Sequence, residues 1–231
     1  MSNIEKIKSL VKEIQNLFLT KKYNLIIKET QKAISQYPNY SIFYNMIGLA
    51  LSQTGKFQDA KIILEEGYKI NPNDLAIINN LANVHKNAFN YSDAEELYNL
   101  SISKKKDYFN SYVNYGNLKR DLNDFKSAIE LYNKASKINE KNSIVQYSLA
   151  LAYQGLGDFK KAVDCAKKVL TIDPKFTQAD LLISQSTKYT ENDIHFKTMN
   201  EKSENLELNV NQKSNLYYGL AKANEDVGNI E

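Results

Sequence analysis

The sequence contains few of the residues that break or cross-link a chain: its 231 residues include 8 glycines, 3 prolines and 1 cysteine. The scarcity of glycine and proline disfavours a β-rich fold, which needs many tight turns, and so favours helices. Cys165 has no second thiol with which to form an intramolecular disulfide or a cysteine metal cluster. It falls on a predicted helix, where we expect it to pack as a small apolar side chain. We therefore expect a helical chain without a metal or a cofactor.

The chain also lacks a strong excess of charge of one sign and a long apolar run. Its 30 basic and 27 acidic residues are interspersed and give a net charge of +3, which is too weak a field to attract nucleic acid or anionic lipid. The opening segment MSNIEKIKSLVKEIQ carries charges where a signal peptide needs its apolar core. We expect a cytoplasmic protein that binds neither nucleic acid nor membranes.

Catalytic motifs are missing as well. The sequence has no G-x-x-x-x-G-K-S/T loop, no G-x-G-x-x-G after a strand and no H-E-x-x-H. His85 lies at a core-facing helix position, so we expect a buried, hydrogen-bonded histidine rather than a ligand. His195 stands beside Asp193 but far from Cys165 in the sequence, and these residues predict no catalytic triad. We therefore predict that the chain is not an enzyme.

A period of 34 residues is the strongest positive feature of the sequence. Three sets of residues recur at this step: Gly48, Ala82, Gly116 and Ala150; Ala60, Ala94, Ala128 and Ala162; and Phe57, Tyr91, Phe125 and Phe159. Turn-like stretches such as QTGK and GLGD precede the third set, so each unit is predicted to be helix, turn, helix. Antiparallel helices approach closely where both present small side chains, so we expect the first two sets to mark the helix crossings.

The pattern resembles the tetratricopeptide repeat. In one unit the residues that match its consensus positions are Tyr44, Ile47, Gly48, Leu51, Ala60, Leu64 and Pro72. The resemblance implies an all-α fold, a right-handed superhelical solenoid of antiparallel helix pairs with about five to six repeats. Residues 41–176 hold the well-matched repeats. Residues 1–40 form an atypical first unit, with Ile14 and Ile26 where small residues belong.

The C-terminal region, residues 177–231, departs from the repeat. Asp180 to Tyr189 predict the first helix of another pair, but the following segment TENDIHFKTMNEKSENLELNVNQ supplies no partner helix in register. Near the end, the pattern predicts half a repeat with an unpaired helix. Such a helix would expose Leu216, Tyr217, Leu220 and Val227, so one hypothesis is self-association through it.

The face of each first helix opposite the core is predicted to line a concave groove, because helical positions turn by 100° per residue. The candidate groove residues are Met46, Leu49, Asn80, Asn83, Asn87, Asn114, Asn117 and Asp121. An asparagine amide both donates and accepts, so a row of them could clamp the backbone of an extended peptide. The middle repeats are similar to those of O-linked N-acetylglucosamine transferases, which implies this role for Asn80, Asn83, Asn114 and Asn117. The alternative is that these are solvated helix faces in an asparagine-rich chain.

The sequence thus favours a module that binds an extended polypeptide along its groove. Chaperone-type tetratricopeptide domains, which capture a terminal carboxylate, are disfavoured because Val11 and Gln15 stand where the opening lysine and asparagine belong. A second alternative comes from the C-terminal stretch, which resembles the junction that precedes the catalytic domain of bacterial tetratricopeptide sulfotransferases. That resemblance implies the non-catalytic part of a truncated or divided sulfotransferase or a related glycosyltransferase-like protein.

Overall fold

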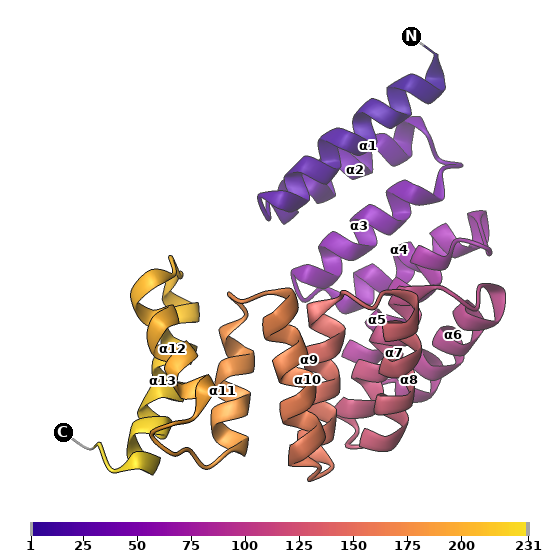
Figure 1. Cartoon of the computed structure of the whole chain (residues 1–231). Coiled ribbons are helices and arrows are strands. Elements are labelled where there is room, and N and C mark those ends of the chain that lie inside the picture. Colours follow the sequence, from indigo (N-terminus) through magenta and orange to yellow (C-terminus); the bar gives the residue numbers. More distant parts are fainter. Residues whose placement is uncertain (1, 230–231) are drawn as a thin grey trace. The chain divides into compact units, whose positions relative to one another are not determined.

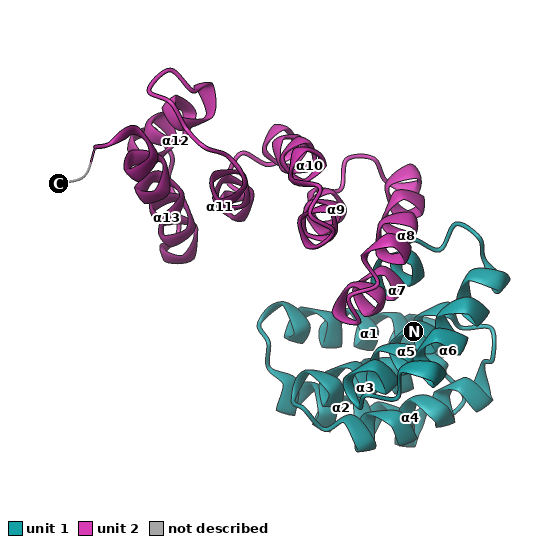
Figure 2. Cartoon of the chain, turned by 90° about the horizontal axis from the view of Figure 1, so that it is seen from below, with its two compact units in different colours: residues 1–114 teal, residues 115–231 magenta. Residues whose placement is uncertain are grey.

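The computed structural model describes residues 2–229, and over these residues the chain forms thirteen α-helices and no strand (Figure 1). The predicted all-α fold is confirmed. The chain divides into two compact units, residues 1–114 and 115–231 (Figure 2).

The first unit contains α1 (Asn3–Leu19), α2 (Tyr23–Gln36), α3 (Ser41–Gln53), α4 (Phe57–Ile70), α5 (Leu75–Asn87) and α6 (Tyr91–Lys104). The boundary between the units falls within α7 (Phe109–Asp121). The second unit continues with α8 (Phe125–Ile138), α9 (Ser143–Gly155), α10 (Phe159–Ile172), α11 (Thr177–Ser186), α12 (Ile194–Asn205) and α13 (Val210–Val227).

Each of the five helix pairs from α1 and α2 to α9 and α10 turns at one residue with a left-handed backbone, and this residue recurs at the 34-residue step. The five positions and their φ angles are Lys21 (53°), Gly55 (77°), Phe89 (62°), Asn123 (59°) and Gly157 (82°). In each turn the N–H of the following residue donates back across the helix end, as from Lys56 to the carbonyl of Leu51 (3.0 Å). This bond satisfies a carbonyl that the helix itself leaves free. The atypical first pair therefore makes the same turn as the well-matched pairs.

In two of the first helices, α3 and α7, the glycine makes room for a large side chain, which differs from the expected meeting of two small residues. A Cβ added at Gly48 would lie 2.5 Å from Cγ of Leu64, and one at Gly116 would lie 2.6 Å from Cε1 of Tyr132. Leu64 and Tyr132 are fully buried on the second helices of their pairs. A glycine is therefore needed at each of these positions because a larger residue would clash with the side chain opposite it.

Bulky residues build the core of the atypical first pair. Ile14 and Ile26 stand where small residues were expected, and both are fully buried. They pack in one cluster with Ile7, Ala33, Phe43, Met46 and Ala50. In the second unit Cys165 is buried on α10, and burial raises the pKa of its thiol, which fits its expected packing role.

The helices of the C-terminal region pack against one another, although the sequence pattern predicts an unpaired helix there. The segment without a repeat partner contains α12, and both α11 and α12 pack against α13. Because of this packing, the prediction that Leu216 and Leu220 are exposed is wrong: both are buried in a cluster with Phe196 and Met199. Tyr217, which is 53% exposed, faces away from that cluster.

Candidate peptide-binding site

A cavity of about 210 Å³ lies in the first unit on the first helices of successive pairs. Five of the predicted groove residues line it: Leu49, Asn80, Asn83, Asn87 and Asn114. They come from α3, α5 and the part of α7 that belongs to this unit. Ser52, Gln53 and Lys86 complete its polar lining. The cavity therefore collects amide groups from three helices and one cation.

The size of this cavity limits what it could hold. Pockets for drug-sized ligands usually measure about 300–1,000 Å³, and this one is smaller. A single water occupies about 30 Å³, so the space suits a short stretch of main chain or one side chain.

Two of the lining amides are held by neighbouring side chains. The Asn80 Nδ2 group donates to Oδ1 of Asn45 on α3 at 2.8 Å. The Tyr98 hydroxyl on α6 donates to Oδ1 of Asn83 at 2.6 Å. Each amide therefore uses one end within the protein.

The remaining predicted groove residues lie elsewhere. Met46 is only 6% exposed because its side chain belongs to the core cluster around Ile14, and it does not line the cavity. Asn117 lies in the second unit, where its Oδ1 accepts a hydrogen bond from the Tyr132 hydroxyl at 2.8 Å. Asp121 is exposed in the same unit, and its Oδ1 lies 3.3 Å from Nη2 of Arg120.

His85 lies on the core side of α5, as expected, and is buried. Its Nδ1 atom is 3.1 Å from a carboxylate oxygen of Asp93, but the two are not aligned for a hydrogen bond, so the expected bonding of the ring is incomplete. Burial, followed by the nearby charge of Lys61, lowers the pKa of His85. The ring is thus held in its neutral form.

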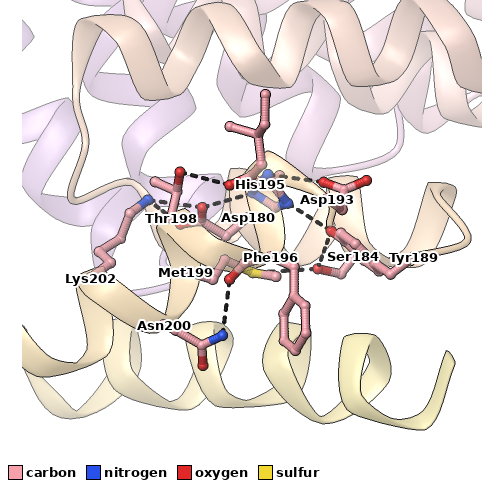
Figure 3. Close-up of polar contacts among 11 residues, drawn as sticks. Asp180, Ser184, Tyr189, Asp193, His195, Phe196, Thr198, Met199, Asn200 and Lys202 are labelled. Carbon is pink, nitrogen blue, oxygen red and sulfur yellow. Dashed lines mark hydrogen bonds and ion pairs between the residues drawn. The ribbon is translucent and has the colours of Figure 1, made fainter. Parts of the chain in front are cut away.

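A buried polar cluster in the second unit was not predicted from the sequence (Figure 3). The Asp180 carboxylate is completely buried, and Nζ of Lys202 donates to both of its oxygens at 2.8 Å. Nε2 of His195 lies 3.1 Å from the same carboxylate. Asp180 comes from α11 and the other two residues from α12, so these bonds tie the two helices together.

Tyr189 extends this cluster from the loop between α11 and α12. Its hydroxyl lies 2.7 Å from Nδ1 of His195 and 3.0 Å from Oγ of Ser184. Its backbone N–H donates to Asp226 on α13 at 3.0 Å. Burial raises the pKa of Tyr189 to about 12, so its hydroxyl stays protonated at neutral pH. Because Asp180 and Tyr189 are both buried, the arrangement suits a cluster that holds helices together better than one that meets a substrate.

One sequence signal could have revealed this cluster. Asp180 precedes Leu182 and Ile183 in a helix whose buried residues carry no other charged side chain. A carboxylate on a core-facing stripe needs a buried partner, and Lys202 supplies it.

Residues 2–229 contain neither a metal-binding cluster nor a membrane-spanning helix. No group of three histidine, cysteine, aspartate or glutamate side chains is placed to hold a metal ion. No helix in this range combines the length and apolar character that crossing a bilayer requires.

Helix pairs that repeat the same turn every 34 residues define a helical-repeat protein. Models of the tetratricopeptide repeat match residues 42–74, 75–104, 116–157 and 143–176. The chain belongs to the tetratricopeptide-repeat family.

Among curated relatives, the chain is similar to the protein O-mannosyl-transferase TMTC3. The mouse protein is 34% identical over 86 residues, which are 37% of this chain and 9% of the relative. The human protein is 30% identical over 109 residues, which are 46% of this chain and 12% of the relative. The matched part is thus a small fraction of these relatives.

Solved structures share the fold at low sequence identity. Yeast Tom70 has a TM-score of 0.69 at 17% identity, covering 87% of this chain and 43% of its own. YrrB, described as a TPR protein with an unusual peptide-binding site, has a TM-score of 0.55 at 15% identity, covering 85% of this chain and 91% of its own. These likenesses support the helical-repeat fold.

Proposed function

We propose that this chain is a protein-interaction module whose first unit holds an extended segment of another polypeptide in the asparagine-lined cavity. The observation that carries the proposal is the convergence of Asn80, Asn83, Asn87 and Asn114 on one cavity. Each amide can both donate and accept, and an extended peptide presents both kinds of group along its backbone. The peptide-binding site described for YrrB supports this use of the fold.

A polypeptide fits this cavity better than a small metabolite does. The space is small and open at the surface, and its lining is rich in neutral amides with Lys86 as a single cation. Neutral amides bind best to groups that carry both donors and acceptors, such as peptide bonds. A charged metabolite would instead need several side chains of opposite charge in the cavity.

The test begins with selection of linear peptides from a random library on the immobilised protein. Binding of one enriched peptide is then measured by calorimetry to the native chain and to the variant Asn80→Ala/Asn83→Ala/Asn114→Ala. We expect the triple variant to lose measurable binding while its circular dichroism stays helical. Asn99→Ala is the matched control, because Asn99 is an exposed asparagine of α6 and does not line the cavity.

Unchanged affinity in the triple variant would refute the proposed site. A loss of affinity in Asn99→Ala as large as that in the triple variant would point to a nonspecific effect of asparagine removal and would also count against it.

A further inference from the structure

The hydrogen bonds that Asn80 and Asn83 already make within the protein decide which group of each side chain is left for a ligand. The Tyr98 hydroxyl takes up Oδ1 of Asn83, so the Nδ2 group of Asn83 is left for another acceptor. The Nδ2 group of Asn80 is bonded to Asn45, so Oδ1 of Asn80 is left for another donor. Asn80 and Asn83 are both partly exposed and both line the cavity, so their remaining groups can meet a ligand there.

The bond between Tyr98 and Asn83 recurs one repeat later in the second unit. There the Tyr132 hydroxyl donates to Oδ1 of Asn117 at 2.8 Å, and both residues lie 34 positions after their counterparts. Burial raises the pKa of Tyr132 to about 12, which keeps its hydroxyl a donor. In the preceding helix pair, Leu49 replaces Asn83 and Leu64 replaces Tyr98, so the bond cannot form there. The arrangement is therefore a feature of two particular repeats.

We propose that Tyr98 is a positioning residue that fixes the Asn83 amide with its NH₂ group available to a bound peptide. With Oδ1 of Asn80 on the same helix, these two side chains offer one donor and one acceptor to the cavity. Asn80 and Asn83 are three residues apart on α5, a spacing that places their Cβ atoms about 5–6 Å apart on the same helix face. A donor and an acceptor on the same helix face can pair with a C=O and an N–H along one edge of an extended main chain.

The ligand class that follows is a polypeptide recognised mainly through its backbone, with wide tolerance of its side chains. This inference rests on the proposed peptide-binding function and adds the direction of each hydrogen bond to it. A fixed amide also loses less conformational freedom when it binds, and so Tyr98 strengthens binding without touching the peptide.

Single variants test the direction of the bonds, with the enriched peptide selected on the native protein as the probe. Asn83→Asp keeps an oxygen for Tyr98 but lacks the NH₂ group, so we expect it to weaken binding by about tenfold, and we expect the same of Asn83→Ala. Binding of Asn83→Asp within twofold of the native chain would overturn the assignment of Asn83 as a donor.

Tyr98→Phe tests the positioning role. We expect about threefold to tenfold weaker binding, since the amide must then be ordered by the ligand. The same substitution should have no further effect when Asn83 is already alanine, an outcome that a merely structural role would not produce. Tyr68→Phe is the control, because no hydrogen bond from the Tyr68 hydroxyl occurs within residues 2–229. Native affinity in Tyr98→Phe would overturn the positioning role.

Backbone recognition is tested on the peptide itself. Each peptide-bond nitrogen is methylated in turn. We expect methylation at one position to abolish binding, although replacement of the side chain at that position by alanine is tolerated. Loss of binding from side-chain changes alone would overturn backbone recognition. These outcomes can be told apart from failure of the proposed peptide-binding site. If that site were wrong, the triple asparagine variant would bind the peptide as the native chain does.

Discussion

Replacement of Lys202 by methionine tests the buried polar cluster of the second unit. Methionine keeps most of the length and apolar character of the side chain but removes the ammonium group that donates twice to Asp180. Asp180 would remain completely buried, with Nε2 of His195 as its remaining side-chain donor. The substitution thus creates a poorly compensated charge in the core without a large change in volume.

Breaking a buried ion pair by removing one partner costs about 3–5 kcal/mol. We expect the lower end of this range, about 3 kcal/mol, because His195 still contacts the carboxylate. Domains are stable by about 5–15 kcal/mol in total, so the loss should be easy to measure. The double variant Asp180→Asn/Lys202→Met removes both charges and should recover most of the loss, because an amide oxygen can still accept from His195.

The assay is urea-induced unfolding combined with hydrogen exchange of peptides from residues 177–229, which reports the second unit directly. Tyrosine fluorescence serves as the optical probe, because the chain has 16 tyrosines and no tryptophan. Lys222→Met is the matched control: Lys222 pairs with Asp226 in the same unit, but its side chain is 35% exposed. We expect its exchange protection to stay native. A loss below about 1 kcal/mol in Lys202→Met would refute the argument that this charge pair is buried and essential.

Three further substitutions test individual packing and turn features. Phe89→Gly should raise the unfolding midpoint, with a gain of about 1 kcal/mol, because Phe89 is 78% exposed and holds a left-handed backbone that glycine adopts freely; a lower melting temperature by calorimetry would contradict this. Gly67→Ala should destabilise the first unit by about 1–3 kcal/mol in urea unfolding, because the new Cβ would lie 2.7 Å from Cβ of Tyr44; unchanged stability would show that α4 can shift. His85→Gln should reduce the pH dependence of first-unit stability, measured by hydrogen exchange at pH 7.5 and pH 5. The pKa of His85 is lowered in the folded state, so the unfolded chain binds the proton more readily and the native chain loses stability as pH falls below about 6.5. An equal pH dependence in the variant would exclude His85 as its source.

The 34-residue period predicts the helix pairs of residues 41–176 because the repeat fixes where a small residue must face a large one. It also identifies the helix face that carries Asn80, Asn83 and Asn114, since that face depends only on the angle between helical residues. Met46 occupies the equivalent face of α3, yet the preceding helix pair covers it. Helical periodicity defines a face but does not reveal which neighbour packs on it.

The C-terminal region was harder to predict for a related reason. The pairing of Asp180 with Lys202 joins residues from two helices that share no repeat register. Leu216 and Leu220 are buried because α13 finds partners in α11 and α12. Such contacts are set by tertiary packing, which no period in the sequence describes.

The recurring left-handed turn affects which changes in chain length the array could tolerate. Loss or gain of a single residue within a helix would rotate everything beyond it by about 100° and remove its apolar stripe from the core. Loss or gain of a block from one such turn to the next, as from Gly55 to Phe89, would leave every helix face and every turn bond in register. The number of helix pairs, and with it the number of amide-bearing first helices, can therefore change in evolution by whole blocks.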